Sequence, residues 1–278
     1  MERNLWKAKQ EMCEIGHRIW LRGYCSGNEG NHSIRIGPDR VLCTPTGVTK
    51  GFLKPEMIRL VDMRGKHLDK DGSTYTPTSE VLIHLEIYKK REDIKAVVHS
   101  HPPHASAFAL VGMPIPEGIH PEAEVFLGRI PFAKFAMPSK MALADSIVPL
   151  IEEDTNSIIM GNHGVVCFSH SLEETYYKLE ILDSYCKVLL LARPLGKPKL
   201  LTNEQMKELL EVKASFGGKD RRMQCIDEGC AQRQAEPFLS SYDNAPSAAD
   251  DGNGNVADRL KILVSEITDQ VLKKISPS

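Results

Sequence analysis

Apolar side chains recur at the spacing of an α-helix in several separate segments of the chain. In one of them Val81, Leu85 and Tyr88 follow one another at intervals of four and three residues, which puts them on one face of a helix. Ser171 and Glu174 have the spacing of a capping box and mark the start of a longer helix, which stops before a proline. The helices predicted from these patterns cover residues 5–22, 81–91, 172–193 and 203–214.

Short apolar runs next to turn residues predict strands between these helices. Most of the runs contain Val or Ile, which are enriched in strands. The predicted strands cover residues 33–36, 41–43, 94–99 and 157–160. The chain therefore combines helices with strands, and it shows no internal repeat.

Two histidines stand two residues apart where the strand over 94–99 ends. Successive side chains of a strand point to opposite faces, so His99 and His101 project together and can bind one metal ion. The strand over 157–160 runs into a Gly-Asn-His-Gly turn that holds His163. Three histidines that leave a coordination position open are the catalytic form of a zinc site. The alternative is that each histidine is an ordinary polar residue at a strand end.

Segments rich in Gly, Ser and Thr offer places for an anion. The turns at residues 26–33 and 44–47 combine glycines, which let backbone amides approach a ligand, with Asn, Ser and Thr donors, so both could hold phosphate. Plain hairpin turns are the alternative for both. A third segment, Thr78-Ser79-Glu80, precedes the helix over 81–91, where the same residue types also serve as a helix cap.

Taken in this order, the segments resemble the class II aldolase and adducin head-domain superfamily over about residues 5–217. The resemblance rests on residues 27–33, 44–47, 78–80, 99–101 and 162–164. It implies an α/β fold, a three-layer α/β/α sandwich around a mixed, mostly antiparallel sheet. It also implies a zinc-dependent aldolase that cleaves a 6-deoxyketose 1-phosphate, L-fuculose 1-phosphate or L-rhamnulose 1-phosphate, to dihydroxyacetone phosphate and lactaldehyde.

The resemblance also assigns roles to individual residues. One Zn²⁺ per subunit is held by His99, His101, His163 and Glu80, and this carboxylate is also the catalytic base. The substrate phosphate is held by Asn31, Thr46, Gly47, Thr78 and Ser79. The chemistry agrees with these roles, because neutral imidazoles leave the metal its full charge to polarise a carbonyl and stabilise an enediolate. The start of a helix likewise favours a bound phosphate.

Glu80 separates the activities within the superfamily. Aldolases and a thioribulose-phosphate dehydratase carry Glu at this position, whereas ribulose-phosphate 4-epimerases carry Asp. The aldolase is therefore the leading hypothesis, with an epimerase or dehydratase of the same superfamily as the alternative, and the metal residues argue against a non-catalytic, adducin-like interaction protein. In one respect the chain departs from the aldolases, because residues 118–124 contain no tyrosine to protonate the aldehyde oxygen. His120, Glu122 and Glu124 are the candidates, unless they are solvated loop residues.

Composition excludes several classes of protein. The chain has 278 residues, 41% of them hydrophobic, which allows a large core, and its net charge of −2 leaves no footprint for nucleic acid. A signal-peptide pattern is missing, and no apolar run approaches the ~20 residues of a membrane span, so we expect a cytoplasmic protein. Seven scattered cysteines argue against a disulfide framework. Four of them are expected in the core: Cys13, Cys43, Cys167 and Cys186.

The composition changes after residue 217, which divides the chain into a catalytic domain over 1–217, an extension and flexible linker over 218–255, and an amphipathic helix over 256–278. The apolar stripe of this helix comprises Val256, Leu260, Leu263, Ile267, Val271 and Ile275. A linker followed by such a helix resembles the encapsulation peptides that bind shell proteins of bacterial microcompartments. The alternatives are packing on its own domain or within an oligomer, while mixed charges disfavour a membrane surface. The family resemblance implies a homotetramer.

Overall fold

The computed structural model describes residues 2–69, 72–230 and 235–243. The chain divides into two compact units, Met1–Leu239 and Ser240–Ser278. Most of the predicted linker and the whole predicted helix over 256–278 lie outside the described residues. The division of the chain after residue 217 therefore stays a prediction.

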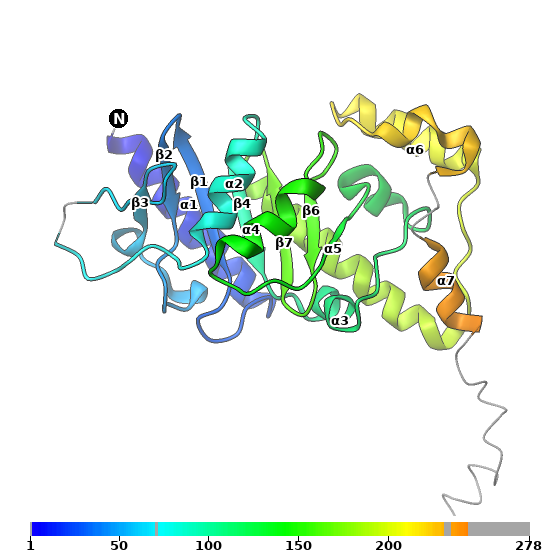
Figure 1. The fold of residues 1–278 in the computed structure, drawn as a ribbon, viewed down its shortest axis with the longest axis horizontal. Coiled ribbons are helices and arrows are strands. Elements are labelled where there is room, and N and C mark those ends of the chain that lie inside the picture. Colours follow the sequence, from blue (N-terminus) through cyan, green and yellow to red (C-terminus); the bar gives the residue numbers. More distant parts are fainter. Residues whose placement is uncertain (1, 70–71, 231–234, 244–278) are drawn as a thin grey trace, which may run out of the picture. The chain divides into compact units, whose positions relative to one another are not determined.

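A seven-stranded sheet forms the centre of the first unit, in the order β3-β2-β1-β4-β7-β6-β5 (Figure 1). The pair β5–β6 is parallel and the other pairs are antiparallel, which confirms the mixed, mostly antiparallel sheet. The strands are β1 (Asn31–Gly37), β2 (Arg40–Cys43), β3 (Arg59–Val61), β4 (Ala96–Ser100), β5 (Phe132–Ala133), β6 (Ser157–Met160) and β7 (Gly164–Ser169).

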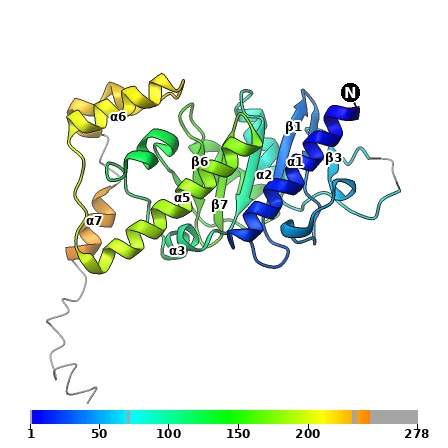
Figure 2. The ribbon, with the colours of Figure 1, turned by 180° about the vertical axis from the view of Figure 1, so that it is seen from behind.

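Helices cover both faces of this sheet. Helices α2 and α4 lie over one face (Figure 1), and α1 and α5 lie over the other (Figure 2), which gives the expected three layers. The helices are α1 (Glu2–Leu21), α2 (Val81–Lys90), α3 (Pro103–Val111), α4 (Met141–Ile147), α5 (Leu172–Ala192), α6 (Asn203–Ser215) and α7 (Ala235–Asp243). Among these described helices, none is long and apolar enough to cross a membrane.

Short helical turns connect the main elements. They are η1 (Lys50–Phe52), η2 (Pro55–Met57), η3 (Ala123–Leu127), η4 (Val148–Leu150), η5 (Arg193–Leu195), η6 (Arg221–Gln224) and η7 (Ile226–Glu228). Of these, η3 is a π-helix and the others are 3₁₀ helices. Such short connections let the chain turn at the ends of the sheet.

The predicted helices form where their apolar faces can be buried. Val81, Leu85 and Tyr88 of α2 are all buried, as the helical spacing predicted. Helix α5 begins after Ser171, whose hydroxyl accepts the backbone N–H of Glu174 at 3.2 Å. The Glu174 carboxylate accepts a hydrogen bond from the Ser169 hydroxyl at 3.0 Å, so the capping box forms in its first half alone.

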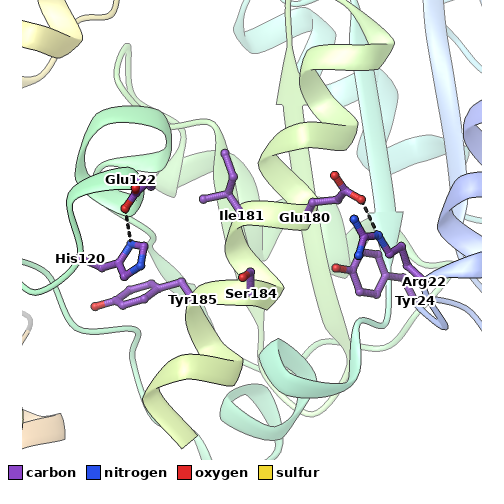
Figure 3. Close-up of a pocket in the computed structure, with 8 residues that line it drawn as sticks. All are labelled: Arg22, Tyr24, His120, Glu122, Glu180, Ile181, Ser184 and Tyr185. Atoms are coloured by element: carbon purple, nitrogen blue, oxygen red, sulfur yellow. Dashed lines mark hydrogen bonds and ion pairs between the residues drawn. The ribbon is translucent and has the colours of Figure 1, made fainter. Parts of the chain in front are cut away.

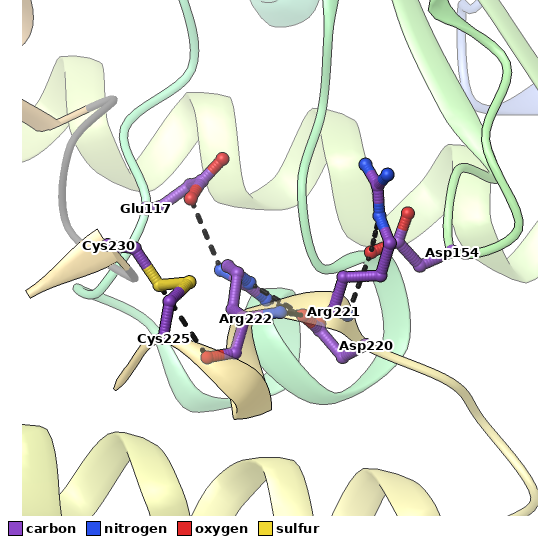
Figure 4. The surroundings of a disulfide bond; sticks show 7 residues. All are labelled: Glu117, Asp154, Asp220, Arg221, Arg222, Cys225 and Cys230. Carbon is purple, nitrogen blue, oxygen red and sulfur yellow. Dashed lines mark hydrogen bonds and ion pairs between the residues drawn. A yellow bond between two sulfur atoms is a disulfide. The ribbon is translucent and has the colours of Figure 1, made fainter. Parts of the chain in front are cut away.

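A buried charge cluster attaches residues 220–230 to the first unit (Figure 4). The Arg222 guanidinium lies 2.6 Å from the carboxylate of Glu124 and 3.4 Å from that of Glu117. A disulfide joins Cys225 to Cys230 in the same segment. The sequence argued against a disulfide framework, and the structure departs from that expectation by one local bond. Cysteines five residues apart are brought together by the η6–η7 turns, which composition does not reveal.

The remaining cysteines are free thiols. Cys43, Cys167 and Cys186 are buried, as expected of core residues. Cys13 is only half-buried, because it lies toward the edge of the buried face of α1.

Candidate metal centre and active site

Three histidines meet where β4 and the turn between β6 and β7 lie side by side. His99 belongs to β4, His101 follows the end of this strand, and His163 lies in the turn. Their ring centroids lie between 4.6 and 5.0 Å apart. One nitrogen from each ring lies within 4.8 Å of the other two. The structure thus brings together the three histidines that the sequence singled out.

Backbone geometry determines how closely the rings can approach. Asn162 has φ 55, a left-handed conformation that Asn tolerates, and it presents His163 at the tip of the turn. At Gly164 a Cβ atom would lie 2.6 Å from Cδ2 of His101, which is closer than non-bonded atoms can approach. The absence of a side chain at this position therefore makes room for the His101 ring.

Hydrogen bonds on the outer nitrogens direct the lone pairs of two rings toward each other. Nδ1 of His99 lies 2.8 Å from the carbonyl oxygen of Val165, which can only accept, so Nδ1 carries the hydrogen. Nδ1 of His101 lies 3.3 Å from the Glu29 carboxylate. The two Nε2 atoms are 3.1 Å apart, close to the ~3.3 Å between neighbouring nitrogens of a tetrahedral zinc site. Facing lone pairs repel unless a cation lies between them, so this arrangement suits a metal ion.

Glu80 completes the cluster from the start of α2. One carboxylate oxygen, Oε2, lies 3.2 Å from Nε2 of His99, and the other lies 3.6 Å from Nε2 of His163. Oε2 also accepts a hydrogen bond from the Asn31 amide at 2.8 Å. Burial would raise the pKa of Glu80, but the hydrogen bond from the Asn31 amide helps to hold that pKa below its usual range. The carboxylate is therefore ionised at neutral pH.

Burial keeps the imidazoles in the form that a metal requires. Burial, and after it the neighbouring His99, lower the pKa of His163 to about 4. The pKa of His101 is also lowered, first by burial and then by His99, against the opposing effect of Glu29. Metal ligands must be neutral imidazoles, so both rings are ready to bind an ion at neutral pH.

The structure also brings together the loop residues that the sequence assigned to phosphate binding, Thr46, Gly47, Thr78 and Ser79. The Thr46 N–H donates to the Thr76 carbonyl, and the Thr78 N–H donates to the Thr44 carbonyl, both at 3.0 Å. The two loops therefore run side by side, immediately before Glu80. Asn31, the fifth of these residues, contacts Glu80 through its amide.

This arrangement coincides with a known family. Residues 10–190 match the model of the Class II Aldolase and Adducin N-terminal domain, and this range contains all of the clustered residues. The chain belongs to this family. Its α/β fold and the mixed sheet are those expected for a class II aldolase.

Relatives within the class II aldolase family differ in the reactions their names describe. L-fuculose phosphate aldolase of Methanocaldococcus jannaschii is 34% identical over 183 residues, 66% of this chain and 96% of the relative. The 3-oxo-tetronate 4-phosphate decarboxylase of Escherichia coli (strain K12) is 30% identical over 207 residues, 72% of this chain and 94% of the relative. The crystal structure of YgbL from Klebsiella pneumoniae superimposes with a TM-score of 0.67 at 26% identity, covering 74% of this chain and 98% of YgbL.

Among the described residues, the candidate proton donors share no contact with the histidine cluster, and His120 and Glu122 pair with each other at 3.2 Å. A cavity of about 420 Å³ beside α5 is lined by Arg22, Tyr24, His120, Glu122, Glu180, Ile181, Ser184 and Tyr185 (Figure 3). Two candidates, His120 and Glu122, thus line a cavity that shares no residue with the histidine cluster. Glu124 is buried and paired with Arg222. The structure therefore does not bring any of the three to Glu80 within this subunit.

Two residues near the metal centre have contacts that the sequence did not predict. Glu29 was part of a turn considered for phosphate, but its carboxylate faces His101. His84 lies on α2 and hydrogen-bonds to Asn31 at 2.6 Å. The four-residue interval from Glu80 to His84 on a predicted helix was the available signal, because it puts both side chains on one face.

Proposed function

We propose that this protein is a zinc-dependent lyase that cleaves L-fuculose 1-phosphate or L-rhamnulose 1-phosphate to dihydroxyacetone phosphate and lactaldehyde. The observation that carries the proposal is the convergence of three imidazoles and one ionised carboxylate beside the two loops that hold Thr46, Gly47, Thr78 and Ser79. Family membership supports a lyase, and the name of the Methanocaldococcus relative supports this substrate class.

The donor set fits a divalent ion of the zinc type. His99, His101 and His163 would hold it, with Glu80 as a fourth ligand in the absence of substrate. The fit rests on the hydrogen on Nδ1 of His99 and on the 3.1 Å between facing Nε2 atoms. When bound, the ion would supply Lewis acidity to a substrate carbonyl.

Glu80 is the proposed base. In the reverse direction it removes a proton from dihydroxyacetone phosphate, and in the cleavage direction it returns a proton to the same carbon, C3, after the C3–C4 bond breaks. The C4 hydroxyl then gives up its proton to the separate group that protonates the aldehyde oxygen in the reverse direction. Its low pKa keeps it ionised for this task. The proposed phosphate contacts come from Asn31, Thr46, Gly47, Thr78 and Ser79, and the Asn31 amide also donates to the base.

A decarboxylase is the second candidate function. It is favoured by the E. coli relative, whose alignment covers more of this chain than the aldolase alignment. Loss of carbon dioxide from a 3-oxo acid breaks a bond next to a polarised carbonyl but needs no base to start it. Glu80 therefore separates the two reactions chemically.

The deciding experiment measures both reactions with metal-loaded protein and its Glu80→Gln variant. We expect release of dihydroxyacetone phosphate from one of the two ketose phosphates, and a fall of roughly two to four orders of magnitude in solvent exchange of its proton for Glu80→Gln. Thr46→Ala and Ser79→Ala should mainly raise KM. Release of carbon dioxide from 3-oxo-tetronate 4-phosphate alone would instead establish the decarboxylase.

We further propose a homotetramer that is packaged in a bacterial microcompartment through residues 256–278. The proposal rests on the apolar stripe and the preceding linker in the sequence. Lactaldehyde is a reactive aldehyde, so a shell around its source would protect the cell.

A further inference from the structure

A chain of hydrogen bonds runs from Glu80 into the interior of the protein. Oε2 of Glu80 lies 2.8 Å from Nδ2 of Asn31, and Oδ1 of Asn31 lies 2.6 Å from Nε2 of His84. Nδ1 of His84 lies 2.7 Å from the Ser33 hydroxyl, which lies 2.8 Å from the Tyr88 hydroxyl. His84, Ser33 and Tyr88 are fully buried, so these groups satisfy one another without solvent.

Two elements supply the members of this chain at matching intervals. Glu80, His84 and Tyr88 follow one another every four residues, which puts them on one face of α2. Asn31 and Ser33 are two residues apart on β1 and therefore share one face of that strand. Along the chain of hydrogen bonds, residues of the helix segment alternate with residues of the strand.

The ionised carboxylate fixes the direction of each hydrogen bond. A carboxylate can only accept, so Asn31 presents its amide nitrogen to Glu80 and its carbonyl oxygen to His84. That oxygen can also only accept, so Nε2 of His84 carries a hydrogen. Burial lowers the pKa of His84 to about 3, so the ring is neutral and its Nδ1 accepts the hydrogen of the Ser33 hydroxyl.

The orientation of the Asn31 amide depends on this neutral ring. A side-chain amide can turn over and exchange its nitrogen and oxygen, which differ little in shape. Because Nε2 of His84 donates its hydrogen, a hydrogen bond forms only when the amide oxygen of Asn31 faces it. The opposite orientation would point the amide oxygen at the Glu80 carboxylate, and the two would repel each other.

We propose that His84 is a positioning residue, which holds the Asn31 amide and through it orients the Glu80 carboxylate at the metal centre. The inference rests on the proposed function insofar as Glu80 is a metal ligand and the base. It adds that a residue buried in the core, acting through Asn31, determines how well Glu80 performs both tasks. The amide nitrogen of Asn31 has two hydrogens, so donation to Glu80 leaves one for a substrate phosphate.

A matched pair of variants tests this role in the full-length protein. His84→Gln keeps a donor toward Asn31 and an acceptor toward Ser33, whereas His84→Leu has a similar size and neither group. Both are made in the native background and together with Asn31→Ala. Tyr88→Phe serves as the control, because it removes a buried hydroxyl from the far end of the same chain.

Three quantities are measured for each protein: zinc affinity by chelator competition, kcat and KM, and the ¹⁵N spectrum of labelled histidines. We expect His84→Leu to lower zinc affinity and kcat by roughly 10- to 100-fold, with a smaller rise in KM because Asn31 is also a proposed phosphate contact, and His84→Gln to restore most of the loss. In the Asn31→Ala background His84→Leu should change them less than about twofold, because the link is already broken. The spectrum should show His84 neutral, with its hydrogen on Nε2.

Equal losses from His84→Leu in the two backgrounds would overturn the inference, as would a hydrogen on Nδ1 of His84 or an equal effect of Tyr88→Phe. Zinc affinity and the spectrum need no substrate. A protein that turns over none of the named substrates but shows the coupling in zinc affinity would refute the proposed reaction and keep this inference. Full turnover of a named substrate, with no coupling between His84 and Asn31 in zinc affinity, would support the proposed reaction and refute this inference.

Discussion

His99 donates its Nδ1 hydrogen to the carbonyl oxygen of Val165 on the neighbouring strand β7. This one hydrogen bond fixes the ring orientation and leaves the lone pair of Nε2 facing Nε2 of His101, 3.1 Å away. Two strands paired in a sheet thus determine a tautomer before any ion binds. Metal binding should therefore depend on all the rings that share the site.

We predict that His101→Ala loses both metal and activity. The native protein should contain about one divalent ion per subunit, and the variant close to none, because two remaining imidazoles hold zinc weakly. Elemental analysis of purified protein measures this. His170→Ala, which changes an exposed histidine, is the matched control and should keep its metal. Full activity of the native protein after exhaustive chelation would contradict the prediction.

Glu29 should matter although it lies outside the ligand set. Its carboxylate lies 3.3 Å from Nδ1 of His101 and also accepts the Ser26 N–H at 2.6 Å. We expect Glu29→Ala to weaken zinc binding by roughly 10- to 100-fold, with the fold intact, because the carboxylate orients the ring and raises its basicity. Chelator competition and circular dichroism measure the two effects. Unchanged zinc affinity would mean that Glu29 only stabilises the turn in which it accepts the Ser26 N–H.

Acid should destabilise the protein through its buried histidines. Burial lowers the pKa of His32 to about 4 and that of His84 to about 3, whereas the unfolded chain takes up these protons near pH 6.5. Each histidine therefore removes up to about 1.36 kcal/mol of the free energy of unfolding per pH unit below 6.5. Glu117, whose pKa burial raises to about 7, opposes this between pH 7 and 4.5. Two histidines outweigh one glutamate, so stability should fall.

Urea unfolding of the metal-free protein between pH 6.5 and 4.5 measures this dependence. In His84→Gln one of the titrating groups is gone, so the free energy of unfolding should fall less steeply, by up to about 1.36 kcal/mol per pH unit. An unchanged or steeper slope would show that His84 does not resist protonation in the folded protein.

The C-terminal segment gives a prediction that is independent of the chemistry. Residues 240–278 fused to a fluorescent protein should direct it to microcompartment shells, and Leu263→Asp with Ile267→Asp should abolish this by placing charges in the apolar stripe. Removal of the segment from the enzyme should leave the oligomeric state and turnover intact, by light scattering and steady-state assay. A diffuse fusion in cells that make shells would refute encapsulation.

Much of the fold was predictable, because the spacing of apolar residues within each segment indicates a helix or a strand. The predicted helix over 81–91 and strand over 157–160 match α2 and β6 within a residue, since each buries one regular face. Strand β7 was not predicted, although its six residues are all buried. It follows the His163 turn directly, so its apolar residues stand next to a turn segment and have no separate start signal of their own.

The residues of the metal centre also divide into those that the sequence predicted and those that it did not. Glu80 and the three histidines carry a local pattern, and the structure brings them together. Glu29 and His84 carry none that identifies a partner, because each acts on a residue far away in the chain: Glu29 on His101, and His84 on Asn31. The pairing of β1 with β4, which sets Asn31 opposite His99, brings Glu29 to His101, and the position of α2 against β1 brings His84 to Asn31.

The order of the strands also determines when the centre can form. Strand β4 is made early in synthesis, but its neighbour β7 contributes the Val165 carbonyl 66 residues after His99. A nascent chain that ends before the turn between β6 and β7 has His99 and His101 but lacks both the third imidazole, His163, and the Val165 carbonyl that fixes the His99 ring. Pairing between such distant segments is slow compared with the formation of local helices. The ion would therefore bind only after β7 has paired with β4, and incomplete nascent chains would not bind it.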